Sequence, residues 1–419
     1  MSRRTPKGFR LHIGLFGRRN VGKSSLLNAI TRQDVSIVSE HAGTTTDPVE
    51  KPMELLPVGP VLFIDTAGID DVGSLGDLRV RRTRSVFDRT DLGVLVTDCE
   101  WGGYERGVLD ELESRDVPAI VAFNKVDIRS VPAGALAEIK SRENVRFVET
   151  AAALGRGVLD FRQAVVDAAP ADFIDNPAIL VDLVGKGGLA VLVVPIDKEA
   201  PKGRLILPQV QTIRDLLDGG ALSLVVRDTE LKDALARLDA PPAIVVTDSQ
   251  AFARVSEDTP PDVPLTSFSI LFSRFKGDLV TQTEGVLAVD DLRAGDRVLV
   301  AEACSHHPIE DDIGRVKIPR WLTERVGARL EFDTVQGHDF PEDLSPYRLV
   351  VHCGACMWNR REMLTRLLRC REAGVPITNY GVAIAASLGI VERALGPFPA
   401  ALEAYRAGRA SRGLASRSA

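Results

Sequence analysis

Residues 11–30 read LHIGLFGRRNVGKSSLLNAI, and this stretch decides the fold of the first part of the chain. An apolar run is followed by GRRNVGKS at residues 17–24 and then by a helix-like segment. In this strand–loop–helix context, G-x-x-x-x-G-K-[ST] binds nucleotide phosphates, because its glycines let backbone N–H groups surround the anion. Lys23 is expected to reach the β- and γ-phosphates, and Ser24 to coordinate Mg²⁺. The stretch therefore predicts a phosphate-binding loop in an α/β domain.

Further segments follow in the order that a guanine-nucleotide site requires. DTAG at residues 65–68 ends an apolar run, where the aspartate is expected to hold the metal shell and a glycine N–H to contact the γ-phosphate. NKVD at residues 124–127 ends another run, and its aspartate can accept both guanine N–H donors, which selects GTP over ATP. Residues 150–151 occupy the place of the last base-contacting loop, and GTTTD at residues 43–47 offers a switch threonine to Mg²⁺.

Together with the phosphate loop, these segments resemble a small GTPase domain of the group that includes Era, EngA and TrmE. The expected GTP-binding residues lie in the loops and at the first helix start: Gly17, Asn20, Val21, Gly22, Lys23, Ser24, Ser25, Asp65, Asn124, Lys125, Asp127, Thr150 and Ala151. The expected catalytic residues are Lys23, Thr45 and Gly68, and the expected Mg²⁺ ligands are Ser24 and Thr45. The sequence thus predicts a Mg²⁺-dependent GTPase.

Two residues bear on the rate of hydrolysis. Ile69 follows DTAG, where Ras-like proteins carry the glutamine that orients the attacking water, so slow intrinsic turnover is expected. Asn20 resembles the asparagine with which potassium-activated members hold K⁺ beside the phosphates. A monovalent cation there would stabilise developing charge much as an arginine finger does. The alternative is that Asn20 is simply a turn residue.

The composition fits a chain of several domains. With 419 residues, of which 45% are apolar, the sequence can form two to three hydrophobic cores. A formal net charge of −6 disfavours a nucleic-acid coat or a binder of anionic membranes. No apolar run reaches the ~18 residues of a membrane span, and MSRRTPKGFR lacks the apolar stretch of a signal peptide. Five cysteines suggest no disulfide framework, so we expect a cytoplasmic protein that binds neither nucleic acid nor membrane.

Apolar runs alternate with helix-like stretches, which is typical of α/β domains with mainly parallel sheets. Strands are expected at residues 11–16, 61–64, 92–97, 119–123, 145–148, 189–194, 223–226, 243–246, 297–301 and 348–351. Helices are expected at 208–217, 230–238, 359–372 and 382–388. We therefore expect three α/β domains, the first a P-loop GTPase with a mainly parallel sheet, and a disordered Arg/Ser-rich tail. Their expected bounds are residues 1–171, 172–268, 269–407 and 408–419.

A second group of candidate residues lies in the third predicted domain. CSHH at residues 304–307 follows one expected strand, and HCGAC at residues 352–356 ends another. Crevices at the carboxyl ends of strands are where α/β sheets bind ligands. The C-x-x-C spacing lets Cys353 and Cys356 hold one centre, with Cys304 as a third thiolate. These residues predict a metal site.

From the spacing alone, zinc and iron–sulfur are equal alternatives at this site. A closed site of three cysteines and one histidine would hold structural zinc. Iron–sulfur clusters are usually held by four cysteines, so a [4Fe–4S] cluster on three would leave one iron with a weak or exchangeable ligand. A thioredoxin-like C-x-x-C would need neither Cys304 nor the histidines.

Longer segments resemble the HydF family, the GTPase maturases of FeFe-hydrogenases. The resemblance covers residues from about 9 to 407 and is carried by residues 42–51, 65–83, 304–322 and 352–356. The family pattern C-x-H…H-C-x-x-C is matched by Cys304, His306, His352, Cys353 and Cys356. The 45 residues between the two histidines, 307–351, lie at the short end of the family's range, which is a minor departure.

The resemblance implies a carrier function. A HydF protein holds a [4Fe–4S] cluster, accepts a two-iron precursor that carries CO and CN⁻, and delivers it to apo FeFe-hydrogenase. The implied partners are the apo-hydrogenase, two radical-SAM maturases that make the precursor's ligands, and a second copy of the chain through the middle domain. Cys304, Cys353 and Cys356 become the cluster ligands. His306 is the first candidate for a displaceable fourth ligand and His352 the second, although either could instead orient a thiolate.

Two alternatives belong to other functional classes. An RNA-associated Era/EngA-like GTPase with a structural zinc domain would carry a basic, aromatic-bearing RNA module, and neither later domain shows one. A GTP-dependent redox sensor would form a reversible disulfide between Cys353 and Cys356 without a metal.

Overall fold

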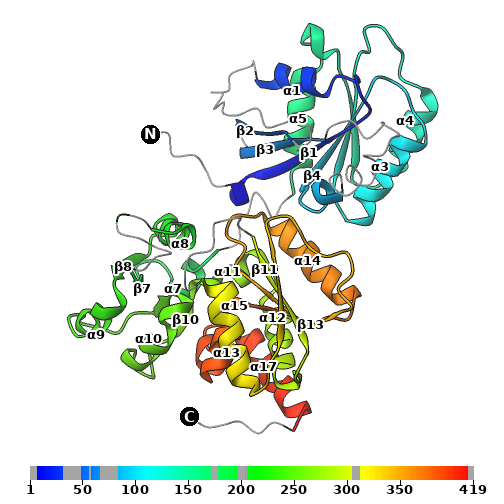
Figure 1. Cartoon of the computed structure of the whole chain (residues 1–419). Coiled ribbons are helices and arrows are strands. Elements are labelled where there is room, and N and C mark those ends of the chain that lie inside the picture. The colour runs from blue at the N-terminus through cyan, green and yellow to red at the C-terminus, as the bar shows by residue number, and fades with distance from the viewer. Residues whose placement is uncertain are drawn as a thin grey trace. The chain divides into compact units, whose positions relative to one another are not determined.

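The computed structural model describes residues 7–31, 49–55, 58–66, 84–170, 178–196, 203, 205–303 and 312–413. The chain divides into two compact units, residues 1–176 and 177–419. In the described ranges, one sheet belongs to the first unit and two four-stranded sheets belong to the second. Both units are α/β structures, as the sequence predicted (Figure 1).

The first unit is built on a six-stranded sheet with the strand order β2-β3-β1-β4-β5-β6. Its strands are β1 (Leu11–Phe16), β2 (Val49–Leu55), β3 (Gly59–Asp65), β4 (Leu92–Thr97), β5 (Ala119–Phe123) and β6 (Val145–Glu149). All pairs are parallel except β2 with β3. Strands β1 and β4 are buried at every position, as expected of central strands covered on both faces. The predicted mainly parallel sheet is therefore confirmed.

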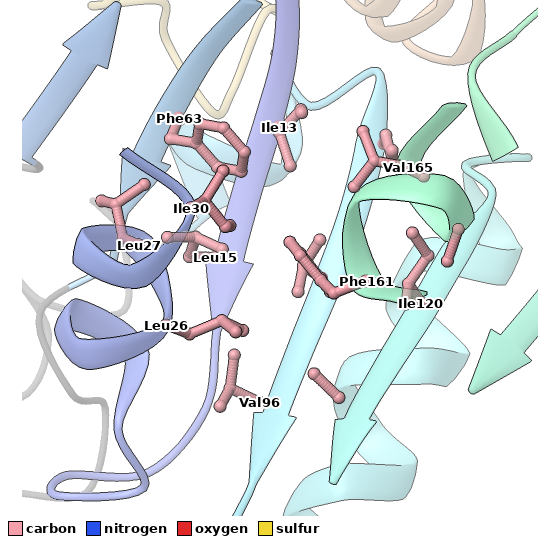
Figure 2. Close-up of a cluster of buried hydrophobic side chains, with 14 of the residues drawn as sticks. Ile13, Leu15, Leu26, Leu27, Ile30, Phe63, Val96, Ile120, Phe161 and Val165 are labelled. Atoms are coloured by element: carbon pink, nitrogen blue, oxygen red, sulfur yellow. The ribbon is translucent and has the colours of Figure 1, made fainter. Parts of the chain in front are cut away.

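Helices cover both faces of this sheet (Figure 1). They are α1 (Lys23–Thr31), α3 (Gly103–Ser114), α4 (Ala133–Lys140) and α5 (Val158–Ala168). One core joins α1 and α5 to the strands, and Figure 2 shows Leu26, Leu27 and Ile30 of α1 and Phe161 and Val165 of α5 directed at them. The other core joins α3 and α4 to the opposite face. Burying each such side chain contributes about 1.5–3 kcal/mol, so the sheet and its helices hold the loops between them in place.

The second unit begins with a parallel sheet in the order β10-β9-β7-β8. Its strands are β7 (Leu189–Val193), β8 (Leu222–Val226), β9 (Ile244–Thr247) and β10 (Leu265–Ser267). Helix α7 (Val181–Val184) precedes this sheet, and α8 (Leu207–Asp218), α9 (Leu231–Leu235) and α10 (Phe252–Asp258) lie between its strands in the sequence.

A second parallel sheet follows, in the order β12-β11-β13-β14. Its strands are β11 (Arg297–Glu302), β12 (Glu331–Gln336), β13 (Tyr347–His352) and β14 (Ile377–Asn379). Its helices are α11 (Phe268–Lys276), α12 (Leu279–Val286), α13 (Ile318–Val326), α14 (Arg360–Glu372), α15 (Tyr380–Leu388), α16 (Val391–Leu395) and α17 (Pro399–Ser411). Because β11 lies beside β13, the segments that follow these two strands begin at the same edge of the sheet.

The two sheets of the second unit are joined by direct contacts. Arg393 donates from Nη1 to the Ser256 carbonyl oxygen at 2.7 Å, and Lys317 donates from Nζ to Gln250 Oε1 at 3.0 Å. The predicted border between residues 268 and 269 falls at the start of α11, so no linker separates the two sheets there. The division into three domains stays a prediction.

The disordered tail was predicted to begin at residue 408, which is too early. Helix α17 continues to Ser411, and Arg412 donates from Nη1 to the Asp291 carboxylate at 2.6 Å. Tyr405 and Ala401 anchor the earlier part of this helix in the core, and residues 408–411 continue it although none of them is buried. Residues 414–419 lie outside the described residues.

Candidate functional site: a nucleotide loop and a cysteine loop

The loop between β1 and α1 has a backbone that requires glycine. Gly17 and Gly22 have φ angles of 143° and 101°, in the region that side chains disfavour. A Cβ atom on Gly22 would lie 2.1 Å from Asn124 Nδ2, and one on Gly17 would lie 2.2 Å from the Val96 carbonyl oxygen. Asn20 has a φ of 62°, which asparagine tolerates better than most residues. The predicted phosphate loop therefore has a backbone of the kind that surrounds an anion.

Lys23 lies across this loop. Its Nζ donates to the carbonyl oxygens of Gly17 at 2.5 Å and Arg18 at 2.9 Å, and the residue is 8% exposed. Both acceptors are neutral, so the ammonium keeps its full positive charge at the centre of the loop. Such a fixed cation attracts the phosphates of a nucleotide.

Ser24 and Asp65 form the metal end of the nucleotide site. The Ser24 hydroxyl donates to Asp65 Oδ2 at 3.5 Å, although the two residues come from α1 and from the end of β3. Burial raises the pKa of Asp65, and the charge of Lys23 opposes that shift. Asp65 Oδ1 is buried and has no hydrogen-bond partner among the described residues. A hydroxyl and a partly unsatisfied carboxylate are oxygen donors of the kind that Mg²⁺ prefers.

Asn124 ties the predicted base-recognition loops to the phosphate loop. Its Nδ2 donates to the Val21 carbonyl oxygen at 2.9 Å, and its Oδ1 accepts from the Thr150 hydroxyl at 3.2 Å. Oδ1 also accepts from the backbone N–H of Ala152 at 3.0 Å. The structure thus brings together the loops after β1, β5 and β6, which are far apart in the sequence.

The neighbouring residues of this loop complete the arrangement. Lys125 donates from Nζ to the Asn20 carbonyl oxygen at 2.7 Å. Asp127 is exposed, so its carboxylate is accessible to the N–H groups of a base, while Thr150 and Ala151 are buried. Ser25 is exposed in the first turn of α1. The expected catalytic residues Thr45 and Gly68 lie outside the described residues.

One support of the phosphate loop was missed in the sequence. Arg18 donates from Nε to Glu105 Oε1 at 2.7 Å and from Nη2 to Oε2 at 3.1 Å, and Glu105 is 1% exposed. Glu105 also accepts from the Gly102 N–H at the start of α3, and Arg18 stacks over Tyr104. A bidentate pair of this kind fixes the direction of the loop. The variable positions of the loop pattern gave no sign of this partner.

The cysteine loop lies between β13 and α14. Cys353 Sγ accepts a hydrogen bond from the Ala303 N–H at 3.1 Å, and Ala303 directly precedes Cys304 in the chain. Ala355 has a φ of 51° and is buried, which turns the chain sharply between Cys353 and Cys356. Cys304 and His306 lie outside the described residues, and no cluster of three or more metal-binding side chains occurs within the described ranges.

Both thiols of the cysteine loop have raised pKa values. Burial raises the pKa of Cys353, and burial together with the neighbouring Cys353 raises the pKa of Cys356 to about 12. Such thiols remain protonated at neutral pH unless a cation replaces their protons. The donor set therefore fits a thiolate-bound metal centre, whose positive charge provides that replacement.

His352 is fully buried beside the cysteines, but both ring nitrogens are hydrogen-bonded. Nδ1 donates to the Cys353 carbonyl oxygen at 2.8 Å, and Nε2 accepts from Arg366 Nη1 at 3.2 Å. This assignment follows because a carbonyl oxygen only accepts and a guanidinium only donates. Burial, with a smaller contribution from the Arg366 charge, lowers the pKa of His352 to about 3, so the imidazole is neutral.

The loops described above define the class of protein: a P-loop GTPase domain followed in the chain by an α/β unit with a partly exposed C-x-x-C loop. Residues 12–125 match the family model described as 50S ribosome-binding GTPase. Residues 179–277 match the hydrogen maturase F dimerization domain, and residues 280–397 match the hydrogen maturase F tetramerization domain. The chain therefore belongs to the HydF family and is a GTPase of hydrogenase maturation, as the sequence predicted. The two matched oligomerization domains support an assembly of several copies.

Two curated relatives each match less than a third of the chain. GTPase Der of Wolinella succinogenes is 38% identical over 125 residues, which cover 29% of this chain and 26% of that protein. The tRNA modification GTPase MnmE of Chromobacterium violaceum is 38% identical over 139 residues, or 32% of this chain and 30% of the relative. The chain thus spans about a quarter to a third of the length of these relatives, and their GTPase names agree with the hydrolysis of GTP.

Solved structures also match part of the chain. Elongation factor SelB of Methanococcus maripaludis covers 38% of this chain and 33% of its own, with 19% identity and a TM-score of 0.31. The G domain of the T. maritima FeoB iron transporter covers 38% of this chain and 99% of its own, with 21% identity and a TM-score of 0.30. None of the helices in the described ranges combines the length and hydropathy of a bilayer span.

Proposed function

We propose that this HydF-family chain is a GTP-hydrolysing scaffold that binds a [4Fe–4S] cluster through Cys304, Cys353 and Cys356. It receives the two-iron precursor of the FeFe-hydrogenase active site and delivers that precursor to apo-hydrogenase. Two radical-SAM maturases, which make the CO and CN⁻ ligands of the precursor, are its partners in the cytoplasm. It acts as a homodimer or a larger assembly and engages neither nucleic acid nor membrane.

The observation that carries this proposal is the contact between the Ala303 N–H and Cys353 Sγ at 3.1 Å. Cys304 follows Ala303 in the sequence, so the third cysteine is bonded to a residue that contacts the C-x-x-C loop. Three thiols can then converge on one centre although they come from segments 50 residues apart. With only three cysteines grouped, one iron of a four-iron cluster takes a displaceable ligand. When bound, the cluster supplies an iron to which a cyanide of the precursor can bridge.

The histidines take different roles in this proposal. His306 is the displaceable fourth ligand. His352 orients the cysteine loop instead, because Arg366 and the Cys353 carbonyl oxygen engage its two nitrogens. This is the alternative that the sequence left open for His352, and outer partners of this kind commonly fix the geometry of a metal site.

The loop residues of the GTPase domain take the roles expected from the sequence, and two of them, Thr45 and Gly68, lie outside the described residues. Lys23 neutralises charge between the β- and γ-phosphates, while Ser24 and Thr45 hold Mg²⁺ and Gly68 contacts the γ-phosphate. Asn20 helps to hold K⁺ beside the phosphates, and this cation stabilises the charge that develops during hydrolysis. The cation thereby compensates for the absence of a water-orienting glutamine. Binding or hydrolysis of GTP moves the switch segments and alters how the scaffold engages its partners.

The RNA-associated alternative has less support than this proposal. It requires a zinc-bearing RNA module after the GTPase domain, whereas residues 179–397 match two hydrogen maturase F domains apart from a two-residue gap. The redox-sensor alternative requires reactive thiolates, whereas burial raises the pKa values of Cys353 and Cys356.

Anaerobic reconstitution with iron and sulfide tests the proposal directly. For a [4Fe–4S] site we expect a broad absorbance at about 400 nm that bleaches with dithionite. The reduced protein should also give an S = 1/2 EPR signal. Cys353→Ala is expected to lose most of the bound iron. Cys370→Ala is the matched control, because Cys370 is a buried cysteine on α14 that lies outside the motif.

Two results would overturn the cluster assignment. One is a colourless protein that carries a single zinc ion after reconstitution, which would leave only the GTPase. The other is equal iron retention by the wild type and the Cys353→Ala variant. Delivery itself is tested by mixing the loaded chain with apo-hydrogenase and measuring hydrogen production, with unloaded chain as the control.

A further inference from the structure

Arg366 is a buried guanidinium next to the cysteine loop. It lies on α14, is 3% exposed, and donates from Nη1 to His352 Nε2 at 3.2 Å. Its Nη2 donates to the Gly337 carbonyl oxygen at 2.7 Å. The guanidinium also lies over the rings of Trp358, 4.1 Å from the centroid, and Phe340, at 4.5 Å. The side chain is therefore fixed by planar contacts on both sides and by hydrogen bonds at its edge.

The charge of Arg366 has no carboxylate partner within ion-pair distance among the described residues. Its hydrogen-bond acceptors among the described residues are an imidazole nitrogen and two backbone carbonyl oxygens, and all three are neutral. Glu362, one turn earlier on α14, favours the charge from a greater distance, but its Oε1 lies 2.6 Å from His338 Nδ1. Burial lowers the pKa of Arg366 to about 10, the reverse of what a close carboxylate would do.

A buried cation of this kind is costly unless an anion accompanies it. After Glu362, the negative charge that most favours the charge of Arg366 is that of the Cys353 thiolate, and Arg366 in turn favours that thiolate. His352 links the two residues, because it accepts a hydrogen bond from Arg366 and donates one to the Cys353 carbonyl oxygen.

We propose that Arg366 is the built-in counter-charge of the cysteine site and the positioning residue for His352. It offsets the negative charge of a thiolate-bound centre and holds the imidazole in the orientation that supports the cysteine loop. Because added negative charge is stabilised by a nearby cation, Arg366 makes one-electron reduction of the bound cluster easier. The electron comes from an external reductant and no proton is transferred. This inference rests on the cluster binding proposed above.

The chain offers a matched control on the same helix. Arg369 also lies over Phe340, at 5.1 Å from the ring centroid, and donates to the Pro341 carbonyl oxygen at 2.6 Å. No contact between Arg369 and His352 occurs in the described part of the chain. Replacing Arg369 therefore removes a cation and a ring contact from α14, while both hydrogen bonds of the His352 ring remain.

The test is an EPR-monitored redox titration of the reconstituted full chain. At a fixed potential near the wild-type midpoint, Arg366→Met is expected to lower the ratio of reduced to oxidised cluster about tenfold, which corresponds to ~59 mV for one electron. Arg366→Lys keeps the charge and is expected to stay within about threefold of the wild type, and Arg369→Met within about twofold. A wild-type ratio in Arg366→Met, or an equal fall in Arg369→Met, would overturn the proposal.

A second measurement separates this inference from the proposed cluster. Co²⁺ is titrated into the unloaded chain, and the thiolate-to-cobalt absorbance is recorded, because Co²⁺ binds cysteine thiolates without iron or sulfide. Arg366→Met is expected to weaken Co²⁺ binding about tenfold, and Arg366→Lys to restore most of that loss. If the wild type takes up no iron, the cluster proposal fails while this titration still decides the role of Arg366. Equal Co²⁺ affinity in the wild type and Arg366→Met would overturn that role.

Discussion

The nucleotide loop and the cysteine loop share one frame but use different chemistry. Each follows a buried parallel strand, β1 or β13, and each leads into a helix, α1 or α14. In the nucleotide loop, Gly17 and Gly22 shape the backbone and exposed positions remain around it. In the cysteine loop, Cys353 and Cys356 are only partly exposed, and the side chains of His352 and Arg366 beside them are buried. The nucleotide loop thus depends mainly on backbone shape, and the cysteine loop on side chains that pack behind it.

The largest expected effect is a loss of GTP turnover that leaves iron binding by the cysteine loop unchanged. Lys23→Ala removes the fixed cation of the nucleotide loop, so GTP turnover is expected to fall on the order of 10³-fold. Iron content after reconstitution should equal that of the wild type, because Lys23 belongs to the first unit and the cysteines belong to the second. Phosphate release and iron assays on the same preparation check this. A parallel loss of iron would show that the two sites are not independent.

The second prediction concerns the backbone on which the nucleotide loop depends. Gly22→Ala places a Cβ at a φ of 101° and 2.1 Å from Asn124 Nδ2. We expect GTP affinity to fall about a hundredfold through strain and the displaced asparagine. A fluorescent GTP analogue measures this, and Gly103→Ala is the control because a Cβ there has nothing within 4 Å. Wild-type affinity in Gly22→Ala would contradict the steric argument.

A smaller effect tests the proposed role of Asn20. If K⁺ stabilises charge beside the phosphates, replacing K⁺ by Na⁺ at constant ionic strength should lower GTP turnover about tenfold. Asn20→Ala should abolish the difference between the two cations. The interpretation of Asn20 as only a turn residue, suggested by its φ of 62°, predicts equal turnover in K⁺ and Na⁺.

The smallest effect is expected in the cysteine loop. Ala355→Gly relieves a φ of 51° but removes a buried methyl group. These terms oppose each other and are each about 1 kcal/mol, so the free energy of unfolding should change by less than ~1 kcal/mol. Denaturant unfolding of the unloaded chain measures it. A change well above ~1 kcal/mol would contradict the balance of these two terms.

Much of the frame could be predicted from the sequence, because buried parallel strands are continuous apolar runs. The runs at residues 11–16, 92–97 and 119–123 coincide with β1, β4 and β5. The edge strands β6 and β8 were also predicted, whereas the edge strands β2 and β12 were missed. Strand β2 reads VEKPMEL and β12 reads EFDTVQ, and both are polar because one face or edge is exposed. Strand β14 has only three residues, too short for a pattern to show.

The loop residues were predictable, but their supports were not. Motif spacing indicates Lys23 or Cys353 because chemistry restricts which residue can stand there. Arg366 stands in the Arg-rich helix sequence RREMLTRLLRCRE, which on its own indicates a solvated surface. Its burial depends on Trp358 and Phe340, which pack around it only in the folded unit. The partner of Arg18, 87 positions away at Glu105, is equally a product of tertiary structure.

The pairing of β11 with β13 also determines when, during folding, the cysteine-bearing segments can come together. The contact from Ala303 to Cys353 spans 50 residues, and closing such a loop costs about 3.5 kcal/mol of chain entropy. Cys304 is synthesised before Cys353 and Cys356, so the proposed cluster can be loaded only after β11 and β13 have paired. Disruption of this pairing should then release the proposed cluster before the rest of the unit unfolds.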